Sequence, residues 1–129
     1  MYNKKWRVMM KPRIEKAKFG SITVGNEKFD HDILIRLNGR VEKRKKKLSK
    51  EIYGTSHTIS RDEARHVYEE GATRLIVGGG HMGSVKLSDE AAAFFSEHGC
   101  DVEIYPIPEV IKAWNKASGK CIGLFHVTC

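Results

Sequence analysis

The apolar residues of this chain change their spacing near residue 60, and that change limits the possible folds more than any other feature. Before it, glycine-containing turn dipeptides separate short segments in which apolar and polar residues partly alternate, a pattern typical of antiparallel strands. After it, segments with helical spacing alternate with short apolar segments. Because helices that alternate with strands favour a largely parallel sheet covered on its faces, the sequence predicts a three-layer α/β fold. Its mixed β-sheet is covered by helices, with an additional N-terminal β-hairpin layer.

Turn and cap signals place the individual elements. Gly25-Asn26 and Asn38-Gly39 are typical of hairpin turns. Ser60 followed by Glu63 forms a capping box, in which the hydroxyl and the carboxylate each bind a backbone N–H. The sequence predicts strands at residues 13–19, 21–24, 32–37, 40–44, 74–77, 101–105 and 122–127, and helices at 61–70, 89–98 and from Pro108 to Gly119.

The chain shows no internal boundary between domains. We expect a single α/β domain over residues 13–129 and a basic N-terminal extension over residues 1–12. Residues 45–57 have no clean period, so we expect a loop there with one helical turn near residues 48–52. The apolar runs are too short for a membrane span, and the N-terminus lacks the features of a signal peptide. A cytoplasmic protein, either a monomer or a weak dimer, is the expectation.

Positive charge is concentrated in the first half. The net charge of +7 combines +10 over residues 1–60 with −3 over residues 61–129. The densest run forms a candidate basic face of Arg40, Lys43, Arg44, Lys45, Lys46, Lys47 and Lys50. Such a run could bind an anionic surface, or it could be a solvated strand edge that lysine protects from pairing. Specific nucleic-acid binding is not expected, because aromatic stacking residues and known recognition motifs are absent.

A glycine-rich loop at residues 78–83 follows an apolar strand and is a candidate ligand site. Ligands of open α/β sheets usually bind at the carboxyl ends of strands, where glycine amides can approach an anion. The candidate residues in this loop are Gly78, Gly79, Gly80 and His81. No helix begins directly after the loop and no Lys-Ser/Thr pair follows, so neither a dinucleotide fingerprint nor a P-loop is expected. A tight turn without a ligand is the alternative.

A second set of candidates comprises Thr55, Ser56, His57 and His126. His126 lies in an apolar strand, where a histidine is either a hydrogen-bonded core residue or a ligand. If it meets His57, the two could form a proton-transfer pair or, with Cys129, a weak metal site. Zinc normally takes four ligands, so no metal and no cofactor are predicted. No catalytic residue is assigned either, because a nucleophile motif is lacking.

Two other groups of residues have side chains of the types that bind metals or form disulfides. In the segment Asp30-His31-Asp32, alternation along a strand would point the histidine away from the two acids, so the three cannot share one ion unless the strand has a bulge. Among the cysteines, Cys121 and Cys129 flank a predicted strand and lie too far apart for a disulfide. A bridge between Cys100 and Cys129 stays open.

Four segments together resemble a known family. They are residues 29–32 (FDHD), 54–57 (GTSH), 77–83 (VGGGHMG) and 125–129 (FHVTC). In order and spacing they are similar to a family of small α/β domains that includes mitochondrial complex I assembly factor three and the human adipogenesis-associated protein, and they look closest to its archaeal members. The resemblance implies a mixed sheet whose last strand is antiparallel to its neighbours. It implies assembly or regulatory roles for eukaryotic members and no established catalytic activity.

These observations lead to two hypotheses about function. The first is a non-catalytic binding or assembly module that engages a protein partner through the basic face and the glycine-rich loop. The second is a small enzyme or sensor that binds an anionic metabolite in a pocket between the glycine-rich loop and residues 54–57. The second requires these two segments to lie beside each other.

Overall fold

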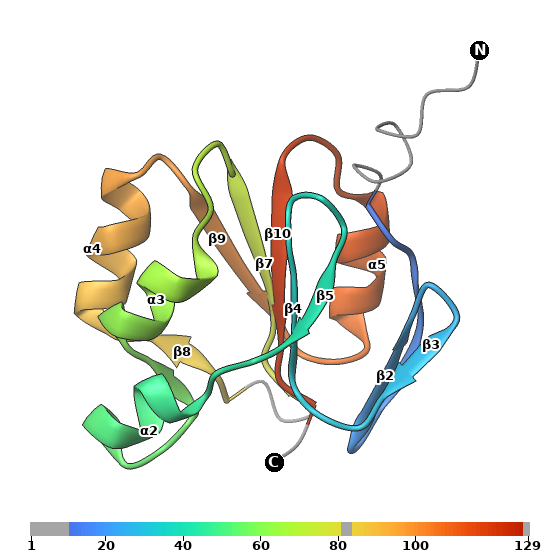
Figure 1. The fold of residues 1–129 in the computed structure, drawn as a ribbon, viewed down its shortest axis with the longest axis horizontal. Coiled ribbons are helices and arrows are strands. Elements are labelled where there is room, and N and C mark those ends of the chain that lie inside the picture. Colours follow the sequence, from blue (N-terminus) through green and yellow to red (C-terminus); the bar gives the residue numbers. More distant parts are fainter. Residues whose placement is uncertain (1–10, 81–83, 128–129) are drawn as a thin grey trace.

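The computed structural model describes residues 11–80 and 84–127 of the chain. A five-stranded mixed sheet lies at its centre, with α3 and α4 on one face and α5 on the other (Figure 1). The strands run in the order β5 (Val41–Lys43), β4 (Ile33–Ile35), β10 (Cys121–Phe125), β7 (Arg74–Gly78) and β9 (Asp101–Tyr105). The covering helices are α3 (Arg61–Val67), α4 (Asp89–Glu97) and α5 (Glu109–Lys116). This arrangement confirms the predicted fold class.

Three further groups of elements surround the sheet. The predicted hairpin layer is a separate antiparallel sheet beside α5, made of β1 (Ile14–Lys18), β2 (Ser21–Val24) and β3 (Glu27–Phe29). The expected single helical turn is a short helix, α2 (Lys47–Tyr53). A parallel pair that the sequence did not predict joins β6 (Thr58–Ile59) to β8 (Lys86–Leu87). None of the helices in the described part of the chain is both long enough and apolar enough to cross a membrane.

The direction of the last strand corrects one expectation. β10 is antiparallel to β4 on one side but parallel to β7 on the other. The helical crossover through α5 carries the chain back to the starting end of β7 and β9, and a strand that follows such a crossover runs parallel. The carboxyl ends of β7, β9 and β10 therefore meet at one end of the molecule (Figure 1).

The sheet buries two apolar cores, one on each face. Leu34, Val77 and Leu124 pack under α3 and α4, whereas Phe125 and Trp114 pack between the sheet, α5 and the hairpin layer. The Trp114 indole N–H donates to the carbonyl of Pro12 (2.8 Å), and the Lys11 ammonium donates to the Trp114 carbonyl. Residues 11 and 12, expected in the extension, thus contact the domain.

One glycine of the glycine-rich loop is explained by packing. A Cβ atom at Gly78 would lie 3.0 Å from the Phe125 ring and 3.2 Å from Val110. A Cβ at Gly123, in the neighbouring strand β10, would lie only 2.4 Å from the same ring. The Phe125 ring therefore lies directly against the backbone of β7 and β10, and larger residues at these two positions would displace it.

The capping box at the start of α3 forms only in part. The Ser60 hydroxyl accepts the Glu63 N–H (3.0 Å), as predicted. The Ser60 N–H, however, donates to the Ser49 hydroxyl (2.9 Å) rather than to the Glu63 carboxylate. Helix α3 also ends at Val67, three residues early, because Tyr68 turns to an extended conformation and its ring packs against His98. The Glu63 carboxylate is therefore available for another contact.

Candidate functional site

Three polar residues continue the register of the sheet one position beyond its strand ends. Phe125 pairs with Ile33, so the next residues along, His126 and Asp32, face each other. Ile33 also pairs with Lys43, which brings Arg44 opposite Asp32 on the other side, where the Arg44 N–H donates to the Asp32 carbonyl (2.9 Å). Because side chains alternate between faces along a strand, all three lie on the α3 side.

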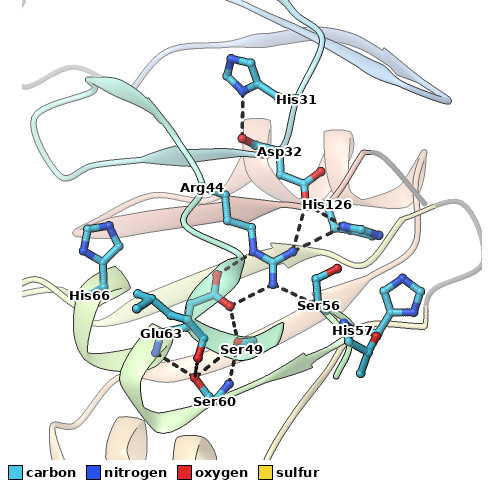
Figure 2. Close-up of polar contacts among 12 residues, drawn as sticks. His31, Asp32, Arg44, Ser49, Ser56, His57, Ser60, Glu63, His66 and His126 are labelled. Carbon is cyan, nitrogen blue, oxygen red and sulfur yellow. Dashed lines mark hydrogen bonds and ion pairs between the residues drawn. The ribbon is translucent and has the colours of Figure 1, made fainter. Parts of the chain in front are cut away.

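The Arg44 guanidinium joins two buried carboxylates (Figure 2). Its Nε and Nη2 donate to the two Glu63 oxygens (2.6 and 2.9 Å), and its Nη1 donates to Asp32 Oδ2 (3.0 Å). Nη2 also donates to the carbonyl of Ser56 (2.8 Å). Burial alone would lower the pKa of Arg44, but the hydrogen bond and charge of Glu63, followed by those of Asp32, outweigh burial and raise it.

This geometry corrects the assignment of Arg44 to the basic face. Its side chain is fully buried, whereas the other cations of that face are exposed. The exposed face therefore comprises Arg40, Lys43, Lys45, Lys46, Lys47 and Lys50. Helix α2 rests on the cluster through Ser49, its one buried residue, whose hydroxyl donates to Glu63 Oε1 (2.5 Å).

The His126 imidazole completes the buried cluster. Its Nδ1 lies 2.7 Å from Asp32 Oδ2 and 3.4 Å from Arg44 Nη1. A carboxylate paired with arginine only accepts hydrogen bonds, so Nδ1 carries the proton. Asp32 Oδ1 accepts the Val127 N–H (2.8 Å), which fixes the carboxylate in place.

The second ring nitrogen of His126 is the unusual feature of the site. Nε2 is buried and has no hydrogen-bond partner among residues 11–80 and 84–127. A buried polar atom without a partner costs about 1–3 kcal/mol of stability. The arrangement in which an aspartate holds Nδ1–H and leaves Nε2 free is also that of histidines that bind or transfer protons. This nitrogen is therefore able to form one further hydrogen bond.

His57 packs beside this imidazole. The ring centroids of His57 and His126 lie 5.0 Å apart at an interplanar angle of 73°. His57 is only half-buried, and its Nδ1 lies 3.4 Å from the hydroxyl of Ser84. The Thr55 hydroxyl accepts the His57 N–H (3.1 Å) and so shapes the turn that presents the ring. The cluster thus extends from buried Asp32 to a partly exposed imidazole.

The glycine-rich loop meets the same residues from the β7 side. The His126 N–H donates to the Gly78 carbonyl (2.8 Å), so the loop begins next to the cluster. The Gly79 N–H donates to the Tyr105 carbonyl (2.8 Å), and the Gly80 carbonyl accepts the Ile107 N–H (3.1 Å). The Gly79 amide is therefore already used within the fold. Because Phe125 pairs with Gly78, Gly79 lies next to His126 on the neighbouring strand, and it adds no side chain there.

The structure therefore brings His57, His126 and the start of the glycine-rich loop together, as the metabolite hypothesis requires. The Thr55 hydroxyl accepts the His57 N–H within the turn, and the Ser56 carbonyl accepts a hydrogen bond from Arg44. His81 and Cys129 lie outside the described residues, so the contribution of His81 to the loop and the bridge of Cys129 to Cys100 stay predictions. Within the described part of the chain, Cys100 and Cys121 form no disulfide, and burial raises the pKa of the Cys100 thiol to about 11.

The sequence does not identify several residues of the site. Asp32 is a candidate there only together with its two neighbours, yet it alone enters the cluster, since Asp30 is exposed and pairs with Lys28 (3.9 Å). Glu63 is expected to act only as a cap. In the part of the chain that the structure describes, no group of three metal-ligating side chains is found. The cluster as it stands can exchange a proton or a hydrogen bond at His126 Nε2.

Eight chains of solved structures are similar to this chain, and three of them illustrate the range. The conserved hypothetical protein PH1505 from Pyrococcus horikoshii OT3 is 32% identical, covering 91% of this chain and 99% of that chain with a TM-score of 0.84. The protein MT938 is 28% identical, covering 92% of this chain and 99% of that chain with a TM-score of 0.77. A Mth938-like domain protein from Bordetella pertussis shares the fold at 15% identity, with coverages of 90% and 85% and a TM-score of 0.61. No protein-family model and no curated protein matches the sequence.

Proposed function

We propose a ligand-binding function for this chain, which belongs to the same family of small α/β proteins as the conserved hypothetical protein PH1505 from Pyrococcus horikoshii OT3. The ligand is a small molecule held beside His126 and His57, at the carboxyl ends of β7 and β10. Ligands of open α/β sheets bind at such ends. This develops the second of the two hypotheses from the sequence, that of a sensor or small enzyme with a metabolite pocket.

The single observation that carries the proposal is the buried Nε2 of His126, which has no hydrogen-bond partner among the described residues. The hydrogen bonds of the cluster link the charged groups of Arg44, Asp32 and Glu63, and in the part of the chain that the structure describes they leave this nitrogen without a partner. An atom in that position gains a hydrogen bond as soon as a ligand supplies a partner. The His57 ring packs beside this nitrogen and is only half-buried, so a ligand can approach the nitrogen past the His57 side chain.

Nuclear magnetic resonance of the imidazole groups tests this proposal. We expect a panel of small carboxylates, sulfate, amines and neutral alcohols to contain at least one compound that shifts the His126 Nε2 signal saturably. The same compound should raise the melting temperature, because a site filled at 100 times its Kd adds about 2.7 kcal/mol of stability. The variant His126→Gln should lose the effect, and His98→Gln, at the far end of α4, should keep it. A panel in which no compound moves His126 contradicts the proposal.

A second candidate function, a docking site for an acidic protein partner, is favoured by the surface of α2. This helix exposes Ile52 and Tyr53, at 54% and 40%, beside Lys46, Lys47 and Lys50. The resemblance to a family that includes mitochondrial complex I assembly factor three supports an assembly role of this kind. A pull-down in which the wild type retains an acidic protein and a variant with all three lysines changed to glutamate does not would support it. Equal recovery by the two proteins would contradict it.

A further inference from the structure

We infer that the ligand beside His126 is a small uncharged molecule that donates a hydrogen bond to Nε2 from a hydroxyl or amide group. This inference rests on the proposed ligand-binding function of the same site and specifies its chemistry. It also gives Gly79, which lies next to His126 just beyond the end of β7, the role of leaving room for that ligand. No covalent bond forms or breaks, and no proton is transferred.

The hydrogen bond at the other ring nitrogen is the first reason. Nδ1 of His126 lies 2.7 Å from Asp32 Oδ2 and donates its proton to that carboxylate. An imidazole with its one ring proton on Nδ1 keeps a lone pair on Nε2, which then acts only as an acceptor. Nε2 is buried and has no hydrogen-bond partner among residues 11–80 and 84–127. A ligand that pairs with this atom must therefore supply a hydrogen-bond donor.

The same geometry disfavours an anion. An anionic oxygen at Nε2 would meet the lone pair, and the Asp32 carboxylate across the ring would add repulsion. The Arg44 guanidinium does not offset this repulsion, because the carboxylates of Asp32 and Glu63 already hold it. Figure 2 shows Asp32 and Arg44 on one side of the His126 ring and His57 on the other.

Burial disfavours a cationic donor. An ammonium group that leaves water for a buried atom loses its hydration, and a buried charge is costly unless a charged partner contacts it. The carboxylate of Asp32 contacts Nδ1, and that of Glu63 contacts Arg44. A donor bound to Nε2 would lie across the imidazole ring from both carboxylates. An uncharged O–H or N–H group supplies the same hydrogen bond without the cost of burying a charge.

The backbone at Gly79 is an independent reason to place a ligand here. The parallel register of β7 and β10 puts Gly79 next to His126, where a side chain would lie on the same face of the sheet. Gly80 takes a positive φ of 84°, which favours glycine, whereas Gly79 does not take a positive φ. The backbone conformation therefore does not require glycine at position 79. Glycine keeps this position free of side-chain atoms, as a ligand beside the ring requires.

Nitrogen spectra of His126 at pH 8 and fixed ionic strength, recorded with small probe molecules, test the inference. The probes are acetamide and ethanol as uncharged donors, N,N-dimethylacetamide as an amide without N–H, and acetate and methylammonium as charged compounds. We expect acetamide and ethanol to shift the Nε2 signal saturably and to leave the ring proton on Nδ1. N,N-dimethylacetamide should bind at least about fivefold more weakly than acetamide, because it leaves the buried Nε2 without a partner. Acetate and methylammonium should also bind more weakly than acetamide.

The variant Gly79→Ala tests the role given to Gly79. Its added methyl group should take up space beside the His126 ring and weaken acetamide binding at least about fivefold. His98→Gln, at the far end of α4, should bind acetamide as the wild type does. Unchanged binding in Gly79→Ala would overturn the role of Gly79. If Gly79→Ala fails to fold, the wild-type series of probes decides alone.

The outcomes separate this inference from the broader proposal. The inference is overturned, and ligand binding stays in place, if N,N-dimethylacetamide, acetate or methylammonium binds as tightly as acetamide and ethanol. Binding of a charged compound alone has the same meaning. Silence of His126 towards every probe and towards the wider panel of compounds overturns both.

Discussion

Two arginines of this protein each form a bidentate ion pair with a glutamate side chain, one pair buried and the other partly exposed. Arg44 donates from Nε and Nη2 to Glu63 at 2.6 and 2.9 Å, and Arg74 donates from the same atoms to Glu103 at 3.0 and 2.9 Å. The side chains of the first pair are 0% exposed, and those of the second are 32% and 30% exposed. Burial is therefore the main difference between the two pairs.

The difference in burial separates the surface ion pair of Arg74 from the buried cluster around Arg44. Exposed ion pairs contribute about 0–1 kcal/mol, and Arg74 with Glu103 needs no further explanation. A buried pair is often no more stable than apolar residues of similar volume, so stability alone does not account for the cluster around Arg44. The cluster also keeps one buried nitrogen unpaired, at His126, within the part of the chain that the structure describes. These two facts are the basis of the proposed binding site.

The largest expected effect comes from removing the buried cation. Arg44→Met would leave Asp32 and Glu63 buried without their partner, and breaking such a pair costs about 3–5 kcal/mol. Urea unfolding followed by circular dichroism measures this loss. A variant less than about 1 kcal/mol below the wild type would mean that burial does not distinguish the two arginines.

A smaller effect is expected from Asp32→Asn. The amide oxygen can still accept the Val127 N–H, but the charge that pairs with Arg44 and holds His126 Nδ1–H is lost. Because hydrogen bonds to charged groups contribute about 1.5–3 kcal/mol, we expect a loss in that range. Asp30→Asn, two residues away and exposed, is the matched control. Equal unfolding midpoints for the two variants would contradict the role given to Asp32.

Local signals explain why the fold could be predicted. Hairpin turns depend on residues such as Gly25 and Gly39, which take positive φ in the structure, and helix starts depend on caps such as Ser60 and Ser88. Each signal lies within a few residues of the element that it places. The pair β6–β8 escaped prediction because two-residue strands carry no period.

The site could be predicted only in part, because its geometry depends on register between distant segments. Asp32 and His126 are 94 positions apart, and no local pattern specifies that they face each other. The cations around Arg44 suggest that it is exposed, yet it continues β5 at the position opposite Asp32. His126 is a polar residue among apolar neighbours, and that signal is enough to make it a candidate.

A weak effect is expected for the exposed pair. Glu103→Gln should cost no more than about 1 kcal/mol, and a double-mutant cycle with Arg74→Met should give a coupling energy of about 0.2–1 kcal/mol. The same cycle at Arg44 and Glu63 should give a much larger coupling. Similar coupling energies at the two pairs would show that burial does not distinguish the pair of Arg44 and Glu63 from that of Arg74 and Glu103.

The smallest expected effect is the pH dependence of that exposed pair. Hydrogen bonds from Arg74 and then Tyr105 lower the pKa of Glu103. A group whose pKa is lower in the folded state stabilises the protein above its unfolded pKa and loses that contribution as the pH falls through the folded value. Between pH 5 and pH 3 the wild type should therefore lose a few tenths of a kcal/mol (about 0.5 at most) more than Glu103→Gln. An identical loss in both proteins would show that the pair has no effect.

The position of the proton on the His126 ring most directly tests the claim that Asp32 holds Nδ1–H and that Nε2 has no partner among the described residues. Long-range 1H–15N correlation spectra at pH 8 should show the proton on Nδ1 and none on Nε2, because Asp32 holds Nδ1–H and Nε2 has no partner in the described residues. The Asp32→Asn variant should lose this preference. A wild-type ring protonated on Nε2 and bare at Nδ1 would contradict the account.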